Sequence, residues 1–257
     1  MPKFCIAIST MNERINNIFI PEYDKDVNYL LIHQINDKNF YPNKLLNERS
    51  DIKYINTDQF GLSKSRNIAL NKCNTEYLFV MDDDVSYDID AMKKIVHFMS
   101  IEKVDVGTFY HNYTNNNSTL KNTRKKITLN YINIAKVSSI DICINVNSIK
   151  KNAIIFNENF GLGTDLPSGE EIIFLSDCLK KSLNLIRYPL IVSTHPPIAS
   201  GLDFYSSTNK IRAKKKMIEI IYGRFSFLFK IMFTIKKFKR AYQAGFGFQF
   251  VKAMFLE

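Results

Sequence analysis

The stretch "EYLFVMDDDVSYD", residues 76–88, runs from an apolar segment directly into three adjacent aspartates. A short run rich in aromatic and β-branched residues predicts a buried strand. Successive side chains of a strand point to opposite faces, so we expect Asp82 and Asp84 on one face and Asp83 on the other. Three neighbouring carboxylates repel one another unless a positive charge compensates them. The stretch therefore predicts a strand that ends in a charged site.

A hard divalent cation, Mg²⁺ or Mn²⁺, is the compensating charge that this pattern favours, because it prefers carboxylate oxygens and also binds phosphates. The alternative is that the aspartates cap the following helix and face water. A calcium-binding EF-hand starting at Asp82 is excluded, because it needs glycine at its sixth position and glutamate at its twelfth. The chain has Tyr87 and Lys93 at those positions.

The first hundred residues alternate between predicted strands and predicted helices. Apolar runs of strand length lie at 3–10, 27–35, 52–57 and 76–81, and helical patterns lie at 61–73 and 89–99. This alternation predicts an α/β fold with a mostly parallel sheet that helices cover on both faces. Ligands of such sheets bind at the carboxyl ends of the strands, where the three aspartates are expected.

The second half of the chain is more mixed. Residues 110–130 are polar and rich in asparagine, which predicts an exposed connection. Residues 127–148 are rich in β-branched residues and predict further strands. A Gly-rich turn then leads into a helix near Glu170, and the segment 186–197 predicts a final strand that ends at His195.

The net charge of +10 is concentrated in one late segment. Residues 209–240 contain eleven Lys or Arg and one acid, while the rest of the chain has 24 basic and 24 acidic residues. A nucleic-acid partner would require a basic groove on the folded core, so we expect no nucleic acid. The four cysteines have no ligand or disulfide spacing, which indicates reduced thiols, and the N-terminal residues do not have the pattern of a signal peptide.

Four stretches occur in an order that resembles the family 2 glycosyltransferases of the GT-A fold found in bacterial polysaccharide, O-antigen and capsule assembly. They are "AISTMNER" (7–14), "GLSKSRNIAL" (61–70), "YLFVMDDDV" (77–85) and "FGLGTDLPSGEEIIFL" (160–175). The resemblance implies a GT-A (Rossmann-like) domain over 1–205, with a nucleotide-sugar-binding half at 1–109 and an acceptor or catalytic half at 127–205. A basic helical tail would follow at 206–257.

On the donor side, the resemblance implies that Thr10 and Asn12 contact the nucleotide and that Arg66 contacts the base or the diphosphate. Without the resemblance, Arg66 is equally well explained by an ion pair. Asp82 and Asp83 would lie around the ribose, the diphosphate or the metal. The family usually has an aspartate after the second strand, where this chain offers Gln34, Asn36 and Asp37. This departure leaves base recognition, and with it uridine, open.

The resemblance also implies a metal site and a catalytic base. Asp84 would be the main ligand of Mn²⁺ or Mg²⁺, with Asp82 and a late histidine, His195, beside it. The alternative for His195 is a structural hydrogen bond. A carboxylate of the pair Glu170 and Glu171 would act as general base, with Glu171 favoured by alignment. On the other interpretation, both acids only stabilise the first turn of a helix.

The tail at 206–257 interleaves aromatic residues with Lys and Arg. Glu219, Arg224 and Lys230 interrupt its most apolar part, which favours a helix lying in a membrane interface over one that spans it. We expect residues 209–240 to bind an anionic membrane surface. The alternative is that these residues pack on the catalytic domain or form an oligomer contact.

Together with these observations, the resemblance implies a metal-dependent, inverting transferase that moves a sugar from a UDP-linked donor to a lipid-linked saccharide acceptor. It would act in the cytoplasm, at the inner face of the cell membrane. Two other classes stay open: a haloacid-dehalogenase-like phosphatase that uses Asp82 and Asp84, and a non-catalytic membrane-binding protein.

Overall fold

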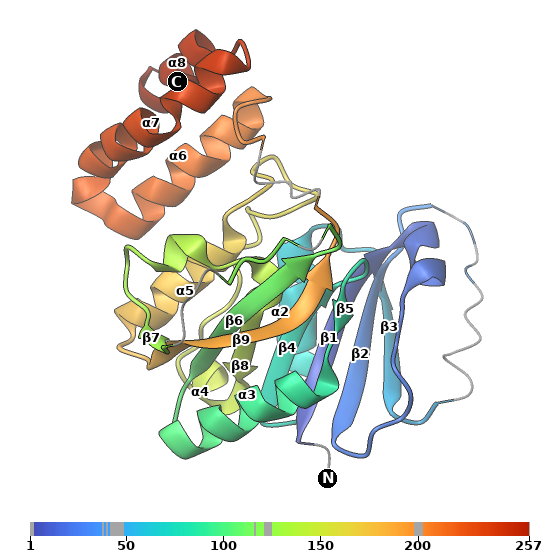
Figure 1. Ribbon diagram of the computed structural model, residues 1–257. Helices are drawn as coiled ribbons and strands as arrows, with labels where there is room; N and C mark the ends of the chain where they lie inside the picture. The colour runs from blue at the N-terminus through green and yellow to red at the C-terminus, as the bar shows by residue number, and fades with distance from the viewer. Residues whose placement is uncertain are drawn as a thin grey trace.

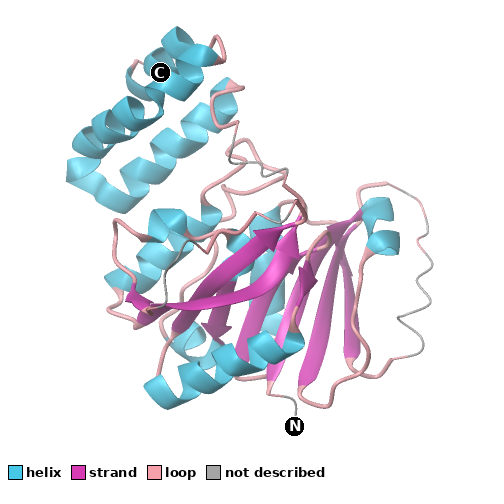
Figure 2. Ribbon diagram, in the orientation of Figure 1, coloured by secondary structure: helices cyan, strands magenta, loops and turns pink. Residues whose placement is uncertain are grey.

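The computed structural model describes residues 3–37, 39, 41, 49–115, 117–120, 125–197 and 203–256. Within these residues, nine strands form one sheet with helices on both faces (Figures 1 and 2). Three further helices at the C-terminal end of the chain lie beyond the sheet, and the first of them contacts α5 (Glu170–Lys180; Figure 1). The predicted α/β class with a mostly parallel sheet is confirmed.

The N-terminal half of the sheet is parallel. Its strands lie in the order β3-β2-β1-β4. They are β1 (Phe4–Met11), β2 (Val27–Gln34), β3 (Ile52–Thr57) and β4 (Tyr77–Asp82). The 3-10 helix η1 (Asn12–Asn17) follows β1, while α2 (Leu62–Lys72) and α3 (Ile89–Glu102) flank β4 in the sequence. The carboxyl ends of β1, β2 and β4 therefore meet at one edge of the sheet.

An antiparallel strand, β8 (Ile142–Asn145), joins this parallel half to the rest of the sheet. It pairs with β4 on one side and with β6 (Val106–Tyr113) on the other. The long strand β9 (Leu185–His195) then runs parallel to β6. Two short strands, β5 (Ser86–Tyr87) and β7 (Ile127–Thr128), pair antiparallel with β9. Because β5 follows the aspartates directly, its pairing brings the end of β9 to the end of β4.

Alternating side chains of the strands divide the core into two clusters. Phe4, Ile6 and Ile8 of β1 pack on the face that α3 covers, while Cys5 and Ala7 pack on the opposite face. That second face is covered by α2, α4 (Val146–Lys151) and α5 (Glu170–Lys180). Both faces of the sheet are thus buried, which explains the nearly continuous apolar runs of its strands. All four cysteines are buried free thiols.

The C-terminal helices are α6 (Thr208–Tyr222), α7 (Ser226–Gln243) and α8 (Gly247–Phe255), with the 3-10 turn η4 (Gly223–Phe225) between the first two. The apolar side of α6 is buried, and Met217 lies against Gly169 at the start of α5. The helices α7 and α8 pack on α6 and on each other. Among the helices described, none has the length and apolarity needed to cross a membrane.

Candidate functional site

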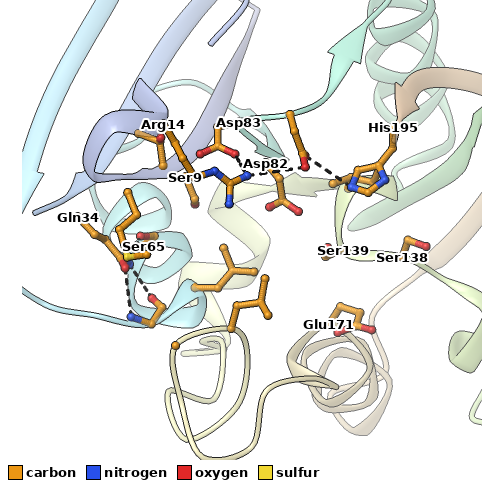
Figure 3. A pocket seen from close by; sticks show the side chains of 18 of the residues that line it. Ser9, Arg14, Gln34, Ser65, Asp82, Asp83, Ser138, Ser139, Glu171 and His195 are labelled. Atoms are coloured by element: carbon orange, nitrogen blue, oxygen red, sulfur yellow. Dashed lines mark hydrogen bonds and ion pairs between the residues drawn. The ribbon is translucent and has the colours of Figure 1, made fainter. Parts of the chain in front are cut away.

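A cavity of about 380 Å³ lies at the carboxyl ends of the strands. It is lined from both halves of the sheet, and Figure 3 shows its main polar side chains. Its volume falls in the range of small-molecule sites. The polar residues in its wall are Ser9, Thr10, Arg14, Gln34, Ser65, Asp82, Asp83, Asp84, His111, Tyr113, Ser138, Ser139, Glu171 and His195.

All three aspartates of the opening stretch line this cavity. The strand β4 ends at Asp82, and Asp83 and Asp84 lie in the turn that follows. The expected alternation of their side chains was therefore wrong, because a turn does not keep the two-residue period of a strand. Asp83 is bound by the guanidinium of Arg14, which also lies 3.7 Å from an Asp84 oxygen. The turn thus directs three carboxylates toward one space.

The electrostatics of the aspartates favour a cation. Burial raises the pKa of Asp82, against the opposing effect of Arg66. Burial also raises the pKa of Asp83, although the Thr10 hydroxyl and the charge of Arg14 act in the opposite direction. A raised carboxyl pKa means that the local positive charge does not fully compensate burial and neighbouring acids. An added cation would relieve this imbalance.

Asp84 and His195 are the residues best placed to hold a metal ion. An oxygen of Asp84 lies 3.5 Å from Nε2 of His195. Nδ1 of His195 bonds the carbonyl of Pro196, so it carries the hydrogen and leaves the Nε2 lone pair toward Asp84. In the described part of the chain, no three His, Cys, Asp or Glu side chains gather in metal-binding geometry. Two protein ligands nevertheless fit Mg²⁺ or Mn²⁺ when substrate phosphates supply the others.

Arg66 lies behind the cavity wall rather than in it. Its side chain is only 2% exposed. Nη1 donates to Glu170 at 2.9 Å, and Nη2 lies 3.3 Å from an oxygen of Asp82. The guanidinium also lies 5.7 Å from the centre of the Phe156 ring. The structure thus places Arg66 in a buried ion-pair network that connects α2, β4 and α5.

The two adjacent glutamates have different surroundings. Glu170 is buried and bound to Arg66, whereas Glu171 lines the cavity. Burial, together with the charge of Glu170, raises the pKa of Glu171 to about 7, and Lys214 of α6 opposes this shift. A carboxylate with a pKa near neutrality is well suited to accept a proton. The geometry therefore separates a cavity-facing acid from one that is held in the interior.

Thr10 and Asn12, for which we expected the same role, also have different surroundings. Thr10 lies in the cavity wall, which does not include Asn12. The side chain of Asn12 donates to the Asn36 side chain at 2.6 Å and accepts from the Asn36 backbone amide at 3.2 Å. Gln34, which stands near the position of the family aspartate, is buried. It donates to the Gly61 carbonyl at 2.8 Å and to the Ser65 hydroxyl at 2.5 Å. Gln34 therefore holds the start of α2 in place.

Close packing of two glycine turns forms one side of the cavity. The Leu62 amide donates to the Leu162 carbonyl at 2.9 Å, and the Ser63 hydroxyl donates to the Phe160 carbonyl at 2.6 Å. Gly163 has a φ of +86°, and a Cβ there would lie 3.3 Å from the Cα of Gly61. The segment "FGLGT" thus closes the cavity by direct contact with the segment "GLSKS".

Sequence reasoning assigned no role to several residues of the wall, among them Arg14, His111, Ser138 and Ser139. Arg14 lies inside the stretch "AISTMNER", in the expected nucleotide-sugar-binding half. Its positive charge in that half was the signal that could have identified it as a residue of the site. His111 and the two serines lie in segments without a recognisable motif. Only the fold brings them to the aspartates.

Residues 41–156 match the model of the family described as glycosyl transferase family 2. This stretch, which is less than half of the chain, is similar to the family 2 glycosyltransferases. The match contains Arg66 and the three aspartates and ends before Glu170 and Glu171.

The fold of the chain is similar to that of S. aureus TarS, a GT-A fold. TarS 1–349 aligns with a TM-score of 0.58 and 17% identity, over 84% of this chain and 65% of that one. Its complex with UDP-GlcNAc gives 0.58 and 16%, over 84% and 66%. The longer TarS structure gives 0.58 and 18%, over 84% and 40%. This chain thus spans about two thirds of the shorter TarS chain and less than half of the longer one. No curated protein sequence matches it.

The buried network predicts that Arg66→Met lowers the free energy of unfolding by about 3 kcal/mol or more, because it leaves two carboxylates without their shared cation. Urea unfolding measures this loss. Lys72→Met, at an exposed position of the same helix, is the matched control and should have little effect. Adding Glu170→Gln to Arg66→Met should restore part of the stability. Equal midpoints for Arg66→Met and Lys72→Met would contradict the network.

Proposed function

We propose that this chain is a glycosyltransferase that transfers a sugar, with inversion, from a nucleoside diphosphate donor, represented by a UDP-sugar, to a saccharide acceptor carried on a membrane lipid. The observation that carries the proposal is the shared cavity, in which the aspartates after β4 face Glu171 from α5. The S. aureus TarS structures with UDP and with UDP-GlcNAc support a nucleotide-sugar donor. We assign the reaction to bacterial surface polysaccharide synthesis.

The aspartate side of the cavity would hold the donor diphosphate. Arg14 offers a guanidinium there, half exposed and already beside Asp83 and Asp84. Asp84 and His195 would hold Mn²⁺ or Mg²⁺, which neutralises the charge that develops on the leaving diphosphate. Thr10 lies in the wall at the end of β1, and its hydroxyl would contact the nucleotide.

Glu171 would accept the proton of the acceptor hydroxyl as that oxygen attacks the anomeric carbon. The attack comes from the side opposite the diphosphate, so the bond to the acceptor forms as the bond to the diphosphate breaks, and the configuration inverts. Glu170 has its carboxylate committed to Arg66 and lies outside the wall. The base is therefore assigned to Glu171.

Two observations weigh against the other classes. A haloacid-dehalogenase nucleophile follows the first strand of its domain, whereas the aspartates here follow β4, beside β1 in a GT-A sheet. A protein that only binds membranes does not require a cavity whose wall contains a carboxylate with a pKa near 7, whereas such a group is typical of a catalytic site.

Glu171→Gln is predicted to lower the transfer rate by at least a hundredfold, because the variant has no group to accept the proton. Glu170→Gln keeps an oxygen for Arg66 and should retain much more activity. The wild-type rate should rise with pH up to about 7 and then level off, since a base with a raised pKa works only above that pKa. Transfer of sugar from UDP-GlcNAc, measured as UDP release from pH 5.5 to 9, tests both points. Equal rates for the two variants would remove Glu171 from the mechanism.

Asp84→Asn is predicted to weaken the Mn²⁺-dependent part of UDP binding at least tenfold, because it removes the carboxylate nearest His195. Calorimetry of UDP with and without Mn²⁺ measures this difference. Asp90→Asn, on the first turn of α3, serves as the control. An unchanged effect of Mn²⁺ in Asp84→Asn would show that the ion binds elsewhere.

For the location of the enzyme, we propose the inner, cytoplasmic face of the cell membrane, with α7 as the contact. Its exposed residues Leu228, Met232, Ile235 and Tyr242 recur on one face of the helix. Lys236, Lys239 and Arg240 are exposed on the same helix. Residues 220–256 contain seven Lys or Arg and no acidic residue.

This surface matches an anionic bilayer better than a second copy of the chain, since two such faces would bring like charges together. In contrast, the apolar side of α6 is already buried. Within the segment 209–240, for which we predicted membrane contact, we therefore assign the contact to α7 and not to α6, and it extends to Tyr242. Membrane binding through α7 would hold a lipid-linked acceptor near the cavity. The alternative, in which α7 forms an oligomer contact, is one of the outcomes of the test that follows.

The double variant Met232→Ser/Ile235→Ser is predicted to lose most binding to vesicles of phosphatidylglycerol and phosphatidylcholine, because it removes apolar area from the contact face. Co-sedimentation measures the bound fraction, which should fall with salt and be small for phosphatidylcholine alone. Ile101→Ser on α3 removes an isoleucine that is 65% exposed, against 73% for Ile235, and should leave binding unchanged. A variant that binds normally, or that instead changes the elution volume on gel filtration, would contradict the membrane assignment.

A further inference from the structure

His111 is a cavity residue that neither the sequence motifs nor the proposed mechanism uses. It lies near the end of β6, and its side chain is only 3% exposed, yet it forms part of the cavity wall. Its ring centre lies 6.3 Å from that of His195 and 5.0 Å from that of Tyr113. It therefore stands close to the metal-binding end of the cavity without belonging to the pair formed by Asp84 and His195.

Three independent features hold His111 in this position. The pairing of β6 with β9 shifts register between Tyr110 and His111, which is the kind of irregularity that re-aims a side chain next to a site. The backbone of His111 is bound on both sides by Thr119, whose hydroxyl accepts from the amide at 2.9 Å and donates to the carbonyl at 2.7 Å. The third feature is the buried partner of the ring, Asp141.

Asp141 determines which nitrogen of the ring carries hydrogen. Its side chain is fully buried, with one oxygen 2.9 Å from Nδ1 of His111 and the other 3.4 Å from Nη2 of Arg187. Arg187 is in turn bound to the carbonyls of Phe109 and Lys136. A carboxylate paired with a guanidinium only accepts hydrogen bonds, so Nδ1 of His111 must be the donor. In the neutral ring, Nε2 is then left as an acceptor.

We propose that His111 binds the transferred sugar, with Nε2 accepting a hydrogen bond from one of its hydroxyl groups. The wall around it fits this role, because Ser138, Ser139 and Glu171 lie on the acceptor side of the same cavity and His195 lies on the diphosphate side. The sugar of a bound donor must lie between these two sides. A hydrogen-bond acceptor held by a buried carboxylate is suited to select a sugar by the position of its hydroxyl groups.

This inference rests on the proposed function, so the test separates the two. Calorimetry in the presence of Mn²⁺ measures dissociation constants for UDP and for UDP-linked glucose, galactose, GlcNAc and glucuronate, and the sugar nucleotide that the wild type binds most tightly is the probe. His111→Gln is expected to weaken binding of the probe about tenfold, the size of one lost hydrogen bond, and to leave UDP binding within twofold. His97→Gln, at an exposed position of α3, is the control.

Asp141→Asn tests the orienting role of Asp141, because the amide can place its NH₂ against Nδ1 and move the ring hydrogen to Nε2. It should weaken the probe and spare UDP, as His111→Gln does. Circular dichroism and thermal melting identify variants that fail to fold, and His111→Asn then replaces an unfolded His111→Gln.

Equal weakening of UDP and the probe would overturn the inference in favour of a diphosphate contact. Unchanged binding of both would leave His111 with a packing role only. A wild type that binds no nucleotide would refute the proposed function itself, and the sugar-binding role with it.

Discussion

The site depends on one buried cation shared by two carboxylates. Arg66 lies in the interior with one nitrogen on Asp82, at the end of β4, and another on Glu170, at the start of α5. These acids are 88 residues apart in the sequence, and β4 and α5, which carry them, lie on opposite sides of the cavity. Burying an unpaired guanidinium or carboxylate costs several kcal/mol, so each of the three groups requires the others. The ion pairs thereby hold Glu171 and the aspartate turn in a defined relation.

The mixed topology of the sheet makes this relation possible. The strand β8 is antiparallel to both of its neighbours, so β6 and β9 run parallel to β4 and have their carboxyl ends at the cavity. His111 and His195 reach the aspartates because of this arrangement. The short β5 then pairs with β9 directly after the aspartate turn.

The sequence predicted the parallel half of the sheet well, because each of its strands is a continuous apolar run between clear turn signals. It also predicted that the aspartates lie where ligands bind, since this follows from strand direction alone. It failed to predict that Asp83 lines the cavity together with Asp82 and Asp84. The residue at which β4 ends depends on the pairing of β5 with β9, which local sequence does not reveal. It left Arg66 between two interpretations, because the partner Glu170 becomes a neighbour only after folding. The Asp141–His111 pair has no local signal either, since 30 residues separate its members.

The tail, residues 206–257, shows a further limit of prediction from the sequence. Its composition predicts amphipathic helices, yet composition does not say which apolar face is covered. The packing of α6 on α5 decides this, since it buries Ile211, Met217 and Ile218 and leaves the outer face of α7 exposed. The same packing brings Lys214 close enough to lower the pKa of Glu171, although burial still dominates. The C-terminal helices therefore affect the cavity electrostatically as well as through packing, so a chain shortened before α6 would lose the neighbour that opposes protonation of Glu171.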